Sequence, residues 1–284
     1  MTDILSFTVS GLDREIKIRD YLTKLGFSSS LIGVVKYDNV LLNGVAVHMR
    51  AMIKNGDVIT VNLPEEESEN IEPMDIPIEV IYEDDHILAV NKPTNMPTHP
   101  ARGNHLPTLA NAVRAYFGKP FVFRSLTRLD RDTSGIVLIA KNRLAAALLS
   151  RDLKSGGFKK IYQATVCGVP CPDSGRIEAP IAREFEGSIK RVVREDGKPA
   201  LTIYQVIGVD GDGNATVELE PVTGRTHQLR VHMAYIGHPL WSDFLYGEQI
   251  GDEPYKLHCK RLEFPHPMTR EKIILNCPPD EGDK

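Results

Sequence analysis

Apolar positions near the start of the chain follow a helical spacing and then an alternating one. Residues 18–25 carry apolar side chains at helical intervals, and the serines at 28–30 can cap a second short helix. Asn43-Gly44 separates two apolar runs, which is typical of a hairpin because both turn residues adopt positive φ. A further strand is expected over 58–61. We therefore expect residues 1–63 to form a small α+β domain.

A polar segment follows this domain. Residues 64–75 are rich in acidic and polar side chains and show no apolar periodicity, so we interpret them as a flexible linker. From residue 76 to residue 284 the pattern favours strands with few helices. Thr108 and Asn142 are candidate N-caps for two of those helices.

Several strands are expected in this larger domain. Residues 136–140 are apolar throughout, which suits a buried strand. Three other segments alternate apolar and polar side chains, namely 160–166, 201–209 and 215–220. Long strands joined by loops indicate a mainly antiparallel mixed sheet flanked by helices and loops. The predicted fold class is α+β, with a small N-terminal α+β domain preceding the sheet domain.

Composition excludes several classes of protein. Hydrophobic residues make up 42% and charged residues 25%, which is typical of a soluble folded protein and not of a disordered or coiled-coil one. Four cysteines in 284 residues do not make a disulfide framework. No apolar run approaches the ~20 residues that span a bilayer, and the N-terminus lacks the pattern of a signal peptide. We expect a cytoplasmic protein that does not enter the membrane.

Charge is unevenly distributed along the chain. The net charge of −4 argues against binding nucleic acid by overall charge. Residues 124–160, however, contain nine basic and three acidic side chains. Such a stretch suits contacts to phosphates, and it equally suits a solvated helix face.

The densest polar run lies directly before the predicted buried strand. It reads Arg128-Leu129-Asp130-Arg131-Asp132-Thr133-Ser134-Gly135. A loop packed against a rigid strand can hold a carboxylate in place for catalysis. The same run suits an ordinary turn, because Asp, Ser and Thr bond to their own backbone and Gly supplies positive φ.

A second run and one tyrosine add candidate chemistry. Within 221–232, Thr226 is a candidate N-cap for a helix whose apolar stripe includes Leu229. Arg225 then lies at a strand-to-helix corner, where it can pair with a carboxylate or stay on the surface. Tyr162 lies on the inward face of an alternating strand, as a core residue or as the floor of a cleft.

Taken in order, these motifs resemble those of RNA pseudouridine synthases of the branch that modifies large-subunit ribosomal RNA and some transfer RNAs. The matching motifs are Asn91-Lys92-Pro93, Arg128-Leu129-Asp130-x-x-Thr133-Ser134-Gly135, Lys160-x-Tyr162-x-Ala164 and Gly224-Arg225-Thr226-His227-Gln228-x-Arg230-x-His232. The resemblance covers residues 76–280, and residues 1–63 are similar to the S4-type RNA-binding domain.

The resemblance implies that specific uridines in structured RNA, above all 23S ribosomal RNA, are isomerised to pseudouridine. The base is flipped out of its stack and the glycosidic bond is broken and re-formed. Asp130 is implied as the catalytic carboxylate, Arg225 as the guanidinium that keeps it ionised, and Tyr162 as the ring that stacks on uracil. The implied RNA-binding residues are Arg128, Leu229, Lys159 and Lys160. The chemistry requires no redox cofactor, ATP or metal, and we expect a monomer.

Two positions depart from the family pattern. Asn95 stands where the family has Gly, and Thr127 stands where it has His. Asn tolerates positive φ, so the turn at Asn95 should survive. Thr127 replaces whatever the usual His contributes, whether an RNA contact or loop packing.

Two other functions remain as alternatives. Asp130-x-Asp132 with Ser134 loosely resembles a Mg²⁺-dependent aspartyl phosphotransferase site, although in such sites a buried strand leads into the first Asp. A non-catalytic RNA-binding or ribosome-assembly protein would retain the same N-terminal domain.

A zinc site is a further alternative that the cysteine and histidine residues raise. Cys167, Cys171, His258 and Cys259 are four possible ligands with loose spacing, which favours scattered thiols instead. His227 and His232 are five positions apart, so they do not share a helix face as a metal-binding pair would. We interpret these two histidines as polar support for the site.

Overall fold

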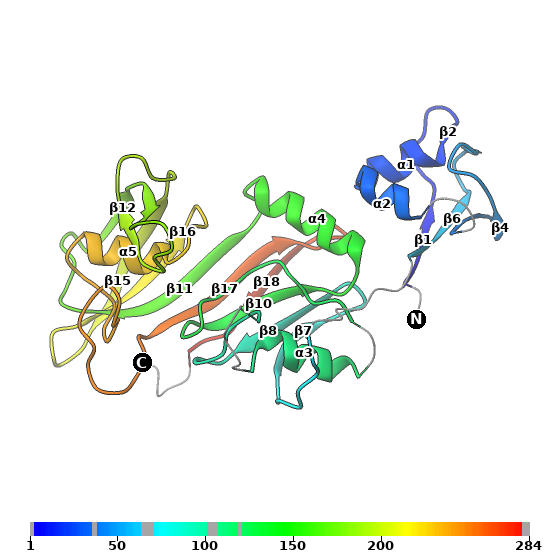
Figure 1. Cartoon of the computed structure of the whole chain (residues 1–284). Coiled ribbons are helices and arrows are strands. Elements are labelled where there is room, and N and C mark those ends of the chain that lie inside the picture. The colour runs from blue at the N-terminus through cyan, green and yellow to red at the C-terminus, as the bar shows by residue number, and fades with distance from the viewer. Residues whose placement is uncertain (1–2, 36–38, 64–70, 101–106, 119–120, 280–284) are drawn as a thin grey trace.

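The computed structural model describes residues 3–35, 39–63, 71–100, 107–118 and 121–279, and the statements below concern those residues. Most of the predicted linker, residues 64–70, lies outside them, and residues 71–75 form an irregular segment. Figure 1 shows a small N-terminal domain (residues 3–63) beside a long twisted sheet.

The N-terminal domain combines two helices with short strands. Its four-stranded sheet has the order β1 (Asp3–Thr8), β6 (Val58–Leu63), β3 (Val40–Leu42) and β4 (Val45–Ala46), and β2 (Ile16–Lys17) pairs separately with β5 (Met52–Ile53). The helices are α1 (Ile18–Lys24) and α2 (Ser29–Val34). Ser28 caps α2 by accepting the Leu31 N–H, and Asn43-Gly44 form the β3–β4 turn with φ of 50° and 84°. The helices and the hairpin are therefore confirmed, whereas β1 carried no signal that we recognised.

The larger domain is built on one ten-stranded sheet. Its main order is β12 (Ser174–Glu178), β15 (Leu201–Val209), β16 (Ala215–Pro221), β11 (Lys159–Val166), β17 (Leu257–Pro265), β10 (Ser134–Ala140), β8 (Ile87–Lys92) and β7 (Glu79–Glu83). β18 (Lys272–Asn276) pairs with β17, and β9 (Arg124–Ser125) pairs with β10. β10 and β17 pair in parallel, and the other described pairs are antiparallel. The α+β class with a mixed, mainly antiparallel sheet is confirmed.

Three helices and one hairpin complete this domain. The helices are α3 (Leu109–Phe117), α4 (Arg143–Lys154) and α5 (Gln228–Tyr235), and the hairpin joins β13 (Ile181–Arg183) to β14 (Arg191–Val193). Thr108 and Asn142 cap α3 and α4, as predicted, because their side chains accept backbone N–H groups that the first helical turn leaves unpaired. In the described residues no helix combines the length and apolar character needed to cross a membrane.

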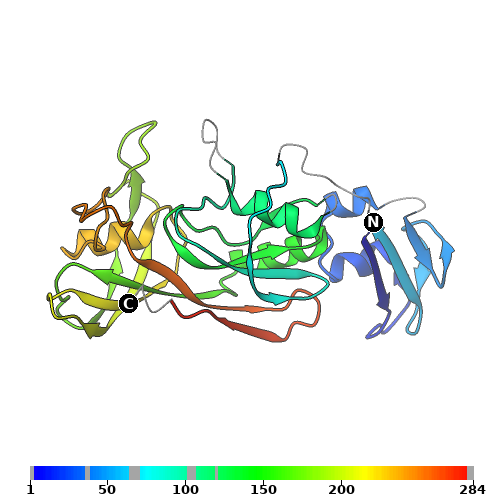
Figure 2. The same cartoon turned by 90° about the horizontal axis from the view of Figure 1, so that it is seen from below.

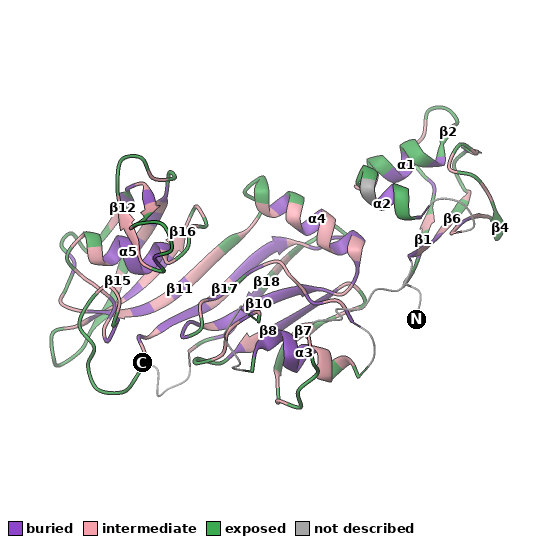
Figure 3. Ribbon diagram, viewed as in Figure 1, coloured by how far each residue is buried: buried purple, intermediate pink, exposed green. Residues whose placement is uncertain are grey.

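The long central strands carry the main core and link the two ends of the sheet. β10 is buried along almost its whole length, and burial continues along β8 and β17 (Figure 3). In Figure 2 the blue N-terminal domain lies at one end of the molecule, and the yellow strands and helix near residue 230 lie at the other. A continuous apolar core under β10 gives the preceding loop a rigid support.

The N-terminal domain packs against α4. Leu144 and Leu148 of α4 are buried in the hydrophobic cluster of the N-terminal domain. The chain turns at Gly26, with φ of 99°, directly over this contact. A Cβ atom on Gly26 would lie 2.2 Å from Leu148 Cδ2, so only glycine fits both the turn and the contact. α4 thus joins the N-terminal domain to the sheet.

Candidate active site

Asp130 lies in a cavity of about 700 Å³ walled by three segments distant in sequence. The walls come from residues 126–133, from the end of α4 with the start of β11, and from the loop leading into α5. The Asp130 side chain is 36% exposed, so a ligand in the cavity can reach it. Tyr162 and Arg225 line the same cavity as Asp130. The structure thus brings together the three residues that the sequence motifs singled out.

The Asp130 loop is held by hydrogen bonds from residues 92–98. Thr98 Oγ1 donates to the Leu129 carbonyl at 2.8 Å, and Thr94 Oγ1 donates to the Asp132 carbonyl at 3.0 Å. On the far side, Gly135 (φ of 104°) passes so close to β17 that a Cβ would lie 2.4 Å from the Cys259 carbonyl oxygen. The backbone around Asp130 is therefore fixed on both sides, as catalysis by a positioned carboxylate requires.

Lys92 is a buried residue of this support that the sequence reasoning did not assign. It is fully buried, and its Nζ donates to the carbonyls of Pro93, Met96 and Arg131 at 2.7 to 3.0 Å. Those three acceptors match the three N–H donors of an ammonium group. Burial lowers the pKa of Lys92 to about 7, and the nearby Asp132 and Asp130 carboxylates oppose that shift. A lysine at the end of an apolar strand is normally expected to be exposed. The hydrophobic pattern therefore does not predict that Lys92 is buried.

The guanidinium beside Asp130 belongs to Arg230, not to Arg225. Arg230 Nη1 lies 4.0 Å from Asp130 Oδ2. Arg225 lines the same cavity, but its Nε donates to the Pro199 carbonyl at 3.0 Å. The predicted Asp130–Arg225 pairing is therefore wrong in this structure.

The start of α5 also differs from the prediction, because the N-cap is His227 and not Thr226. Arg225 precedes the helix, where the Gln228 side chain accepts its backbone N–H at 3.0 Å and the Pro199 carbonyl accepts from its side chain. Arg230 lies in the first turn of the helix and is buried. Arginine is rare at buried positions unless it is paired, so a pattern of apolar residues did not point to it.

Arg230 is itself held rigidly. Its Nε and Nη2 donate to the buried carboxylate of Asp243 at 2.7 and 2.6 Å. Its guanidinium lies 4.2 Å from the ring centre of Tyr255 and 5.0 Å from that of Tyr246. A bidentate carboxylate and aromatic faces fix the plane of the guanidinium. Arg230 is thus a fixed positive charge directed at Asp130.

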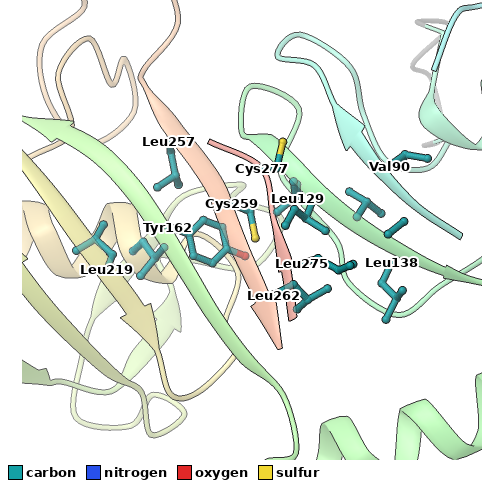
Figure 4. Close-up of a cluster of buried hydrophobic side chains, with 14 of the residues drawn as sticks. Val90, Leu129, Leu138, Tyr162, Leu219, Leu257, Cys259, Leu262, Leu275 and Cys277 are labelled. Atoms are coloured by element: carbon teal, nitrogen blue, oxygen red, sulfur yellow. The ribbon is translucent and has the colours of Figure 1, made fainter. Parts of the chain in front are cut away.

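Tyr162 forms part of the cavity and is otherwise buried, in agreement with its predicted inward direction. In Figure 4 its hydroxyl extends from β11 toward Cys259 on β17. A β-bulge interrupts the β11–β17 pairing between Ile161 and Tyr162, and bulges near active sites redirect side chains. Burial and the Cys259 thiol hold the pKa of Tyr162 well above its usual range. Tyr162 therefore stays a neutral phenol.

The predicted RNA-binding residues divide into two groups. Arg128, Leu229 and Lys160 line the cavity, and Arg128 is exposed. Lys159 is not part of the cavity wall, because it points away and pairs with Glu220 at 3.0 Å. Burial lowers the pKa of Lys160. The structure thus brings three of the four residues to Asp130.

The two departures from the family pattern are accommodated locally. Asn95 has a φ of 57°, so the left-handed turn is kept as predicted. Thr127 is buried, and its hydroxyl accepts the Leu138 N–H at 3.0 Å. Thr127 thus contributes loop packing against β10.

The two histidines of the α5 segment have different surroundings. His232 is fully buried and bonds Thr202 Oγ1 and the Ala179 carbonyl, so it supports the fold. His227 lines the Asp130 cavity instead. Within the part of the chain that the structure describes, no group of three or more His, Cys, Asp or Glu side chains is arranged to hold a metal ion.

A second cavity, of about 860 Å³, contains none of Asp130, Tyr162 and Arg230. Its wall includes Ser134 and His258, whose Oγ and Nδ1 lie 2.8 Å apart. His258 Nε2 must donate to the Cys277 carbonyl, so Ser134 is the donor to Nδ1. This hydrogen bond joins the start of β10 to β17. The candidate active site is therefore the smaller cavity, which contains Asp130.

Comparison with known proteins agrees with this geometry. The sequence model of the RNA pseudouridylate synthase family matches residues 86–235. A Bacillus subtilis protein named as an uncharacterized RNA pseudouridine synthase is 37% identical, with 92% of this chain and 94% of that protein aligned. Ribosomal large subunit pseudouridine synthase D of Xanthomonas campestris is 34% identical, with 87% and 80% aligned.

A solved structure gives the same result. Human RNA pseudouridylate synthase domain containing 1 superposes with a TM-score of 0.62 at 31% identity, over 74% of this chain and 86% of that one. The buried strand β10 follows Asp130, which is the reverse of the order in the phosphotransferase alternative. The chain belongs to the RNA pseudouridylate synthase family and is an RNA pseudouridine synthase, an isomerase.

Proposed function

We propose that this enzyme converts specific uridines of structured RNA, with 23S ribosomal RNA as the substrate, to pseudouridine through the carboxylate of Asp130. The observation that carries the proposal is the position of that carboxylate. His227 Nε2 lies 3.9 Å and Arg230 Nη1 4.0 Å from its Oδ2, and the cavity leaves it open. A carboxylate that lies beside a fixed guanidinium without forming a short ion pair with it is free to contact a substrate.

The reaction breaks the N1–C1′ bond of uridine, turns the uracil and forms a C5–C1′ bond. The Asp130 carboxylate serves as nucleophile toward C6 or C1′, or as the base that removes a sugar proton. Each route requires the flipped nucleoside to enter the cavity beside Asp130, and flipping costs a few kcal/mol for a typical nucleotide. The neutral ring of Tyr162 offers a face on which the extruded uracil can stack.

The surroundings of the cavity support RNA as the substrate. Arg128 and Lys154 line it, and both side chains are exposed. Exposed cations at the mouth suit the phosphates on either side of a flipped base. We assign Arg128 the role of occupying the space that the base vacates.

We assign residues 1–63 to an S4-like RNA-binding domain that holds the RNA next to this site. α4 supports the assignment, because Leu148 contacts the N-terminal domain while Lys154, at the end of the same helix, lines the cavity. α1 carries the exposed basic residues Arg19 and Lys24, which suit contacts to RNA phosphates. The proposal includes a cytoplasmic monomer, since one chain supplies every residue of the site.

The ribosomal target rests on relatives such as the Xanthomonas campestris protein, whose name refers to the ribosomal large subunit. The test is to map pseudouridines in ribosomal and transfer RNA from a strain that lacks this protein. We expect one or more 23S positions to lose the modification and to regain it with the wild-type protein but not with Asp130→Asn. A full set of 23S pseudouridines together with a loss in transfer RNA would overturn the ribosomal assignment.

A further inference from the structure

His227 lies beside Asp130 in a backbone conformation that favours glycine. Its φ and ψ are 57° and 18°, at the N-cap of α5. A residue with a β-carbon is strained in this conformation, which persists only where the surrounding structure holds it. Here the bend directs the imidazole into the cavity, with Nε2 3.9 Å from Asp130 Oδ2.

The other ring nitrogen of His227 is held by Tyr246. The Tyr246 hydroxyl lies 2.7 Å from His227 Nδ1, and it accepts the Arg191 N–H at 2.9 Å. The two rings meet edge to face at 5.7 Å. Asp243 positions this tyrosine in turn, because its Oδ1 accepts the Tyr246 N–H. A connected path thus runs from the hairpin β13–β14 through Tyr246 and His227 to Asp130.

The direction of the hydrogen bond follows from proton count. A phenol has one proton to donate, and within the described residues the Tyr246 hydroxyl has His227 Nδ1 as its acceptor. Were Nδ1 to donate instead, the Tyr246 hydroxyl would accept from both Nδ1 and the Arg191 N–H, and its own proton would need an acceptor other than His227. Burial raises the pKa of Tyr246 to about 12, so the phenol keeps its proton. Nδ1 is then the acceptor, and the remaining ring proton is on Nε2.

The charged groups around His227 leave the ring neutral. Burial lowers its pKa, Asp130 and Asp243 oppose this effect, and Arg230 and Arg191 add to it. A neutral ring has one N–H, and Tyr246 determines which nitrogen carries it.

We propose that Tyr246 fixes His227 as the Nε2–H tautomer and that this N–H, facing Asp130, makes His227 a positioning residue that orients the catalytic carboxylate. Asp243 holds the Nε and Nη2 of Arg230, whose Nη1 lies 4.0 Å from the same Asp130 carboxylate oxygen, so His227 adds a second donor beside this fixed charge. The separation of His227 Nε2 from Asp130 Oδ2 is 3.9 Å in the free protein. The proposal requires this contact to shorten when RNA binds, as contacts in free enzymes often do. The inference deepens the proposed function and rests on the role of Asp130.

The first test measures the tautomer directly and does not depend on activity. Nitrogen-15 spectra of histidine-labelled protein at pH 7.5 distinguish an Nε2–H ring, an Nδ1–H ring and a doubly protonated ring, and the missing signal in His227→Gln assigns the resonance. We expect the Nε2–H form. Either of the other two forms would overturn the proposal, whatever the activity of the enzyme.

The second test uses two substitutions of His227, each of which keeps a donor at the position of one ring nitrogen. The amide nitrogen of Gln can occupy the place of Nε2, and that of Asn the place of Nδ1. Because a hydrogen bond to a charged group is lost, His227→Asn should lower kcat by about 10- to 100-fold, with KM for RNA changed by less than about threefold. His227→Gln should retain kcat within about threefold, because it can still donate to Asp130.

A merely structural role predicts the opposite order, because Asn tolerates positive φ better than Gln does. Equal kcat losses in the two variants, or a smaller loss for Asn, would overturn the proposal. Tyr246→Phe should lower kcat as His227→Asn does, and Tyr235→Phe, an exposed position on α5, is the matched control. If Asp130→Asn turns over normally, the role of Asp130 fails, while the tautomer result still stands or falls by the spectrum.

Discussion

Arg230 Nη1 lies 4.0 Å from Asp130 Oδ2, although a long stretch of chain separates the two residues. The parallel pairing of β10 with β17 and the antiparallel pairing of β11 with β16 bring together the loops that carry them. Neither residue's neighbours in sequence predict the contact, and the sheet topology produces it.

Arg230 should therefore be the arginine on which catalysis depends. Arg230→Gln should lower the single-turnover rate by about 10²–10³-fold, because a preorganised charge beside the reacting carboxylate is lost. It should also lower the free energy of unfolding by about 3–5 kcal/mol, since the buried Asp243 loses its partner. Rates at a temperature where circular dichroism shows the variant folded separate the two effects.

Arg225→Gln is the matched control for that experiment. Its guanidinium donates to a carbonyl at the surface, so the free energy of unfolding should change by no more than about 0.5 kcal/mol. A greater rate loss for Arg225→Gln than for Arg230→Gln would restore the original assignment and refute the one made from the structure.

Lys92 should make stability rise with pH above neutrality. Its pKa of about 7 in the folded protein lies below the value near 10.4 of an exposed lysine. Between these values the unfolded chain binds one more proton, so the free energy of unfolding increases with pH by up to about 1.4 kcal/mol per unit. Denaturant titrations from pH 6 to pH 10 measure this slope.

Lys92→Met should lack that contribution, and Lys154→Met, an exposed substitution, should keep it. If the free energy of unfolding changes with pH by the same slope in wild-type protein and in Lys92→Met between pH 7 and 10, Lys92 stays charged throughout that range and the prediction fails.

The contact between Gly26 and Leu148 should control docking of the N-terminal domain. Gly26→Ala should lower stability through its positive φ and also force Leu148 to move, adding about 1–3 kcal/mol of overpacking. Gly44→Ala shares the positive φ, but a Cβ there meets nothing within 4 Å. Small-angle scattering should give a larger radius of gyration for Gly26→Ala alone. An unchanged radius in both variants would mean that this contact does not hold the domain.

Local signals in the sequence predicted much of the fold. Thr108 and Asn142 cap helices because a side chain needs only the first turn to find its N–H partner. The run 136–140 is a buried strand because no polar residue interrupts it. Such features depend on a few adjacent residues, so a pattern reveals them.

The remaining features depend on distant partners. The inward direction of Arg230 is set by Asp243 and Tyr255, which lie in later loops. Lys92 donates to two nearby carbonyls, those of Pro93 and Met96, but its third acceptor is the Arg131 carbonyl on the distant Asp130 loop. In both cases a charged side chain lies at a position that the pattern treats as solvent-facing, because part of its compensation comes from elsewhere in the chain.

The most direct test of the central claim uses purified protein and RNA tritiated at uracil C5. Isomerisation at a target uridine releases that tritium as C5 becomes bonded to C1′. We expect Asp130→Asn to bind RNA within about threefold of wild type and to release no tritium above background, while Asp212→Asn, an exposed control, releases it at the wild-type rate. Tritium release by Asp130→Asn at a rate near wild type would contradict the account.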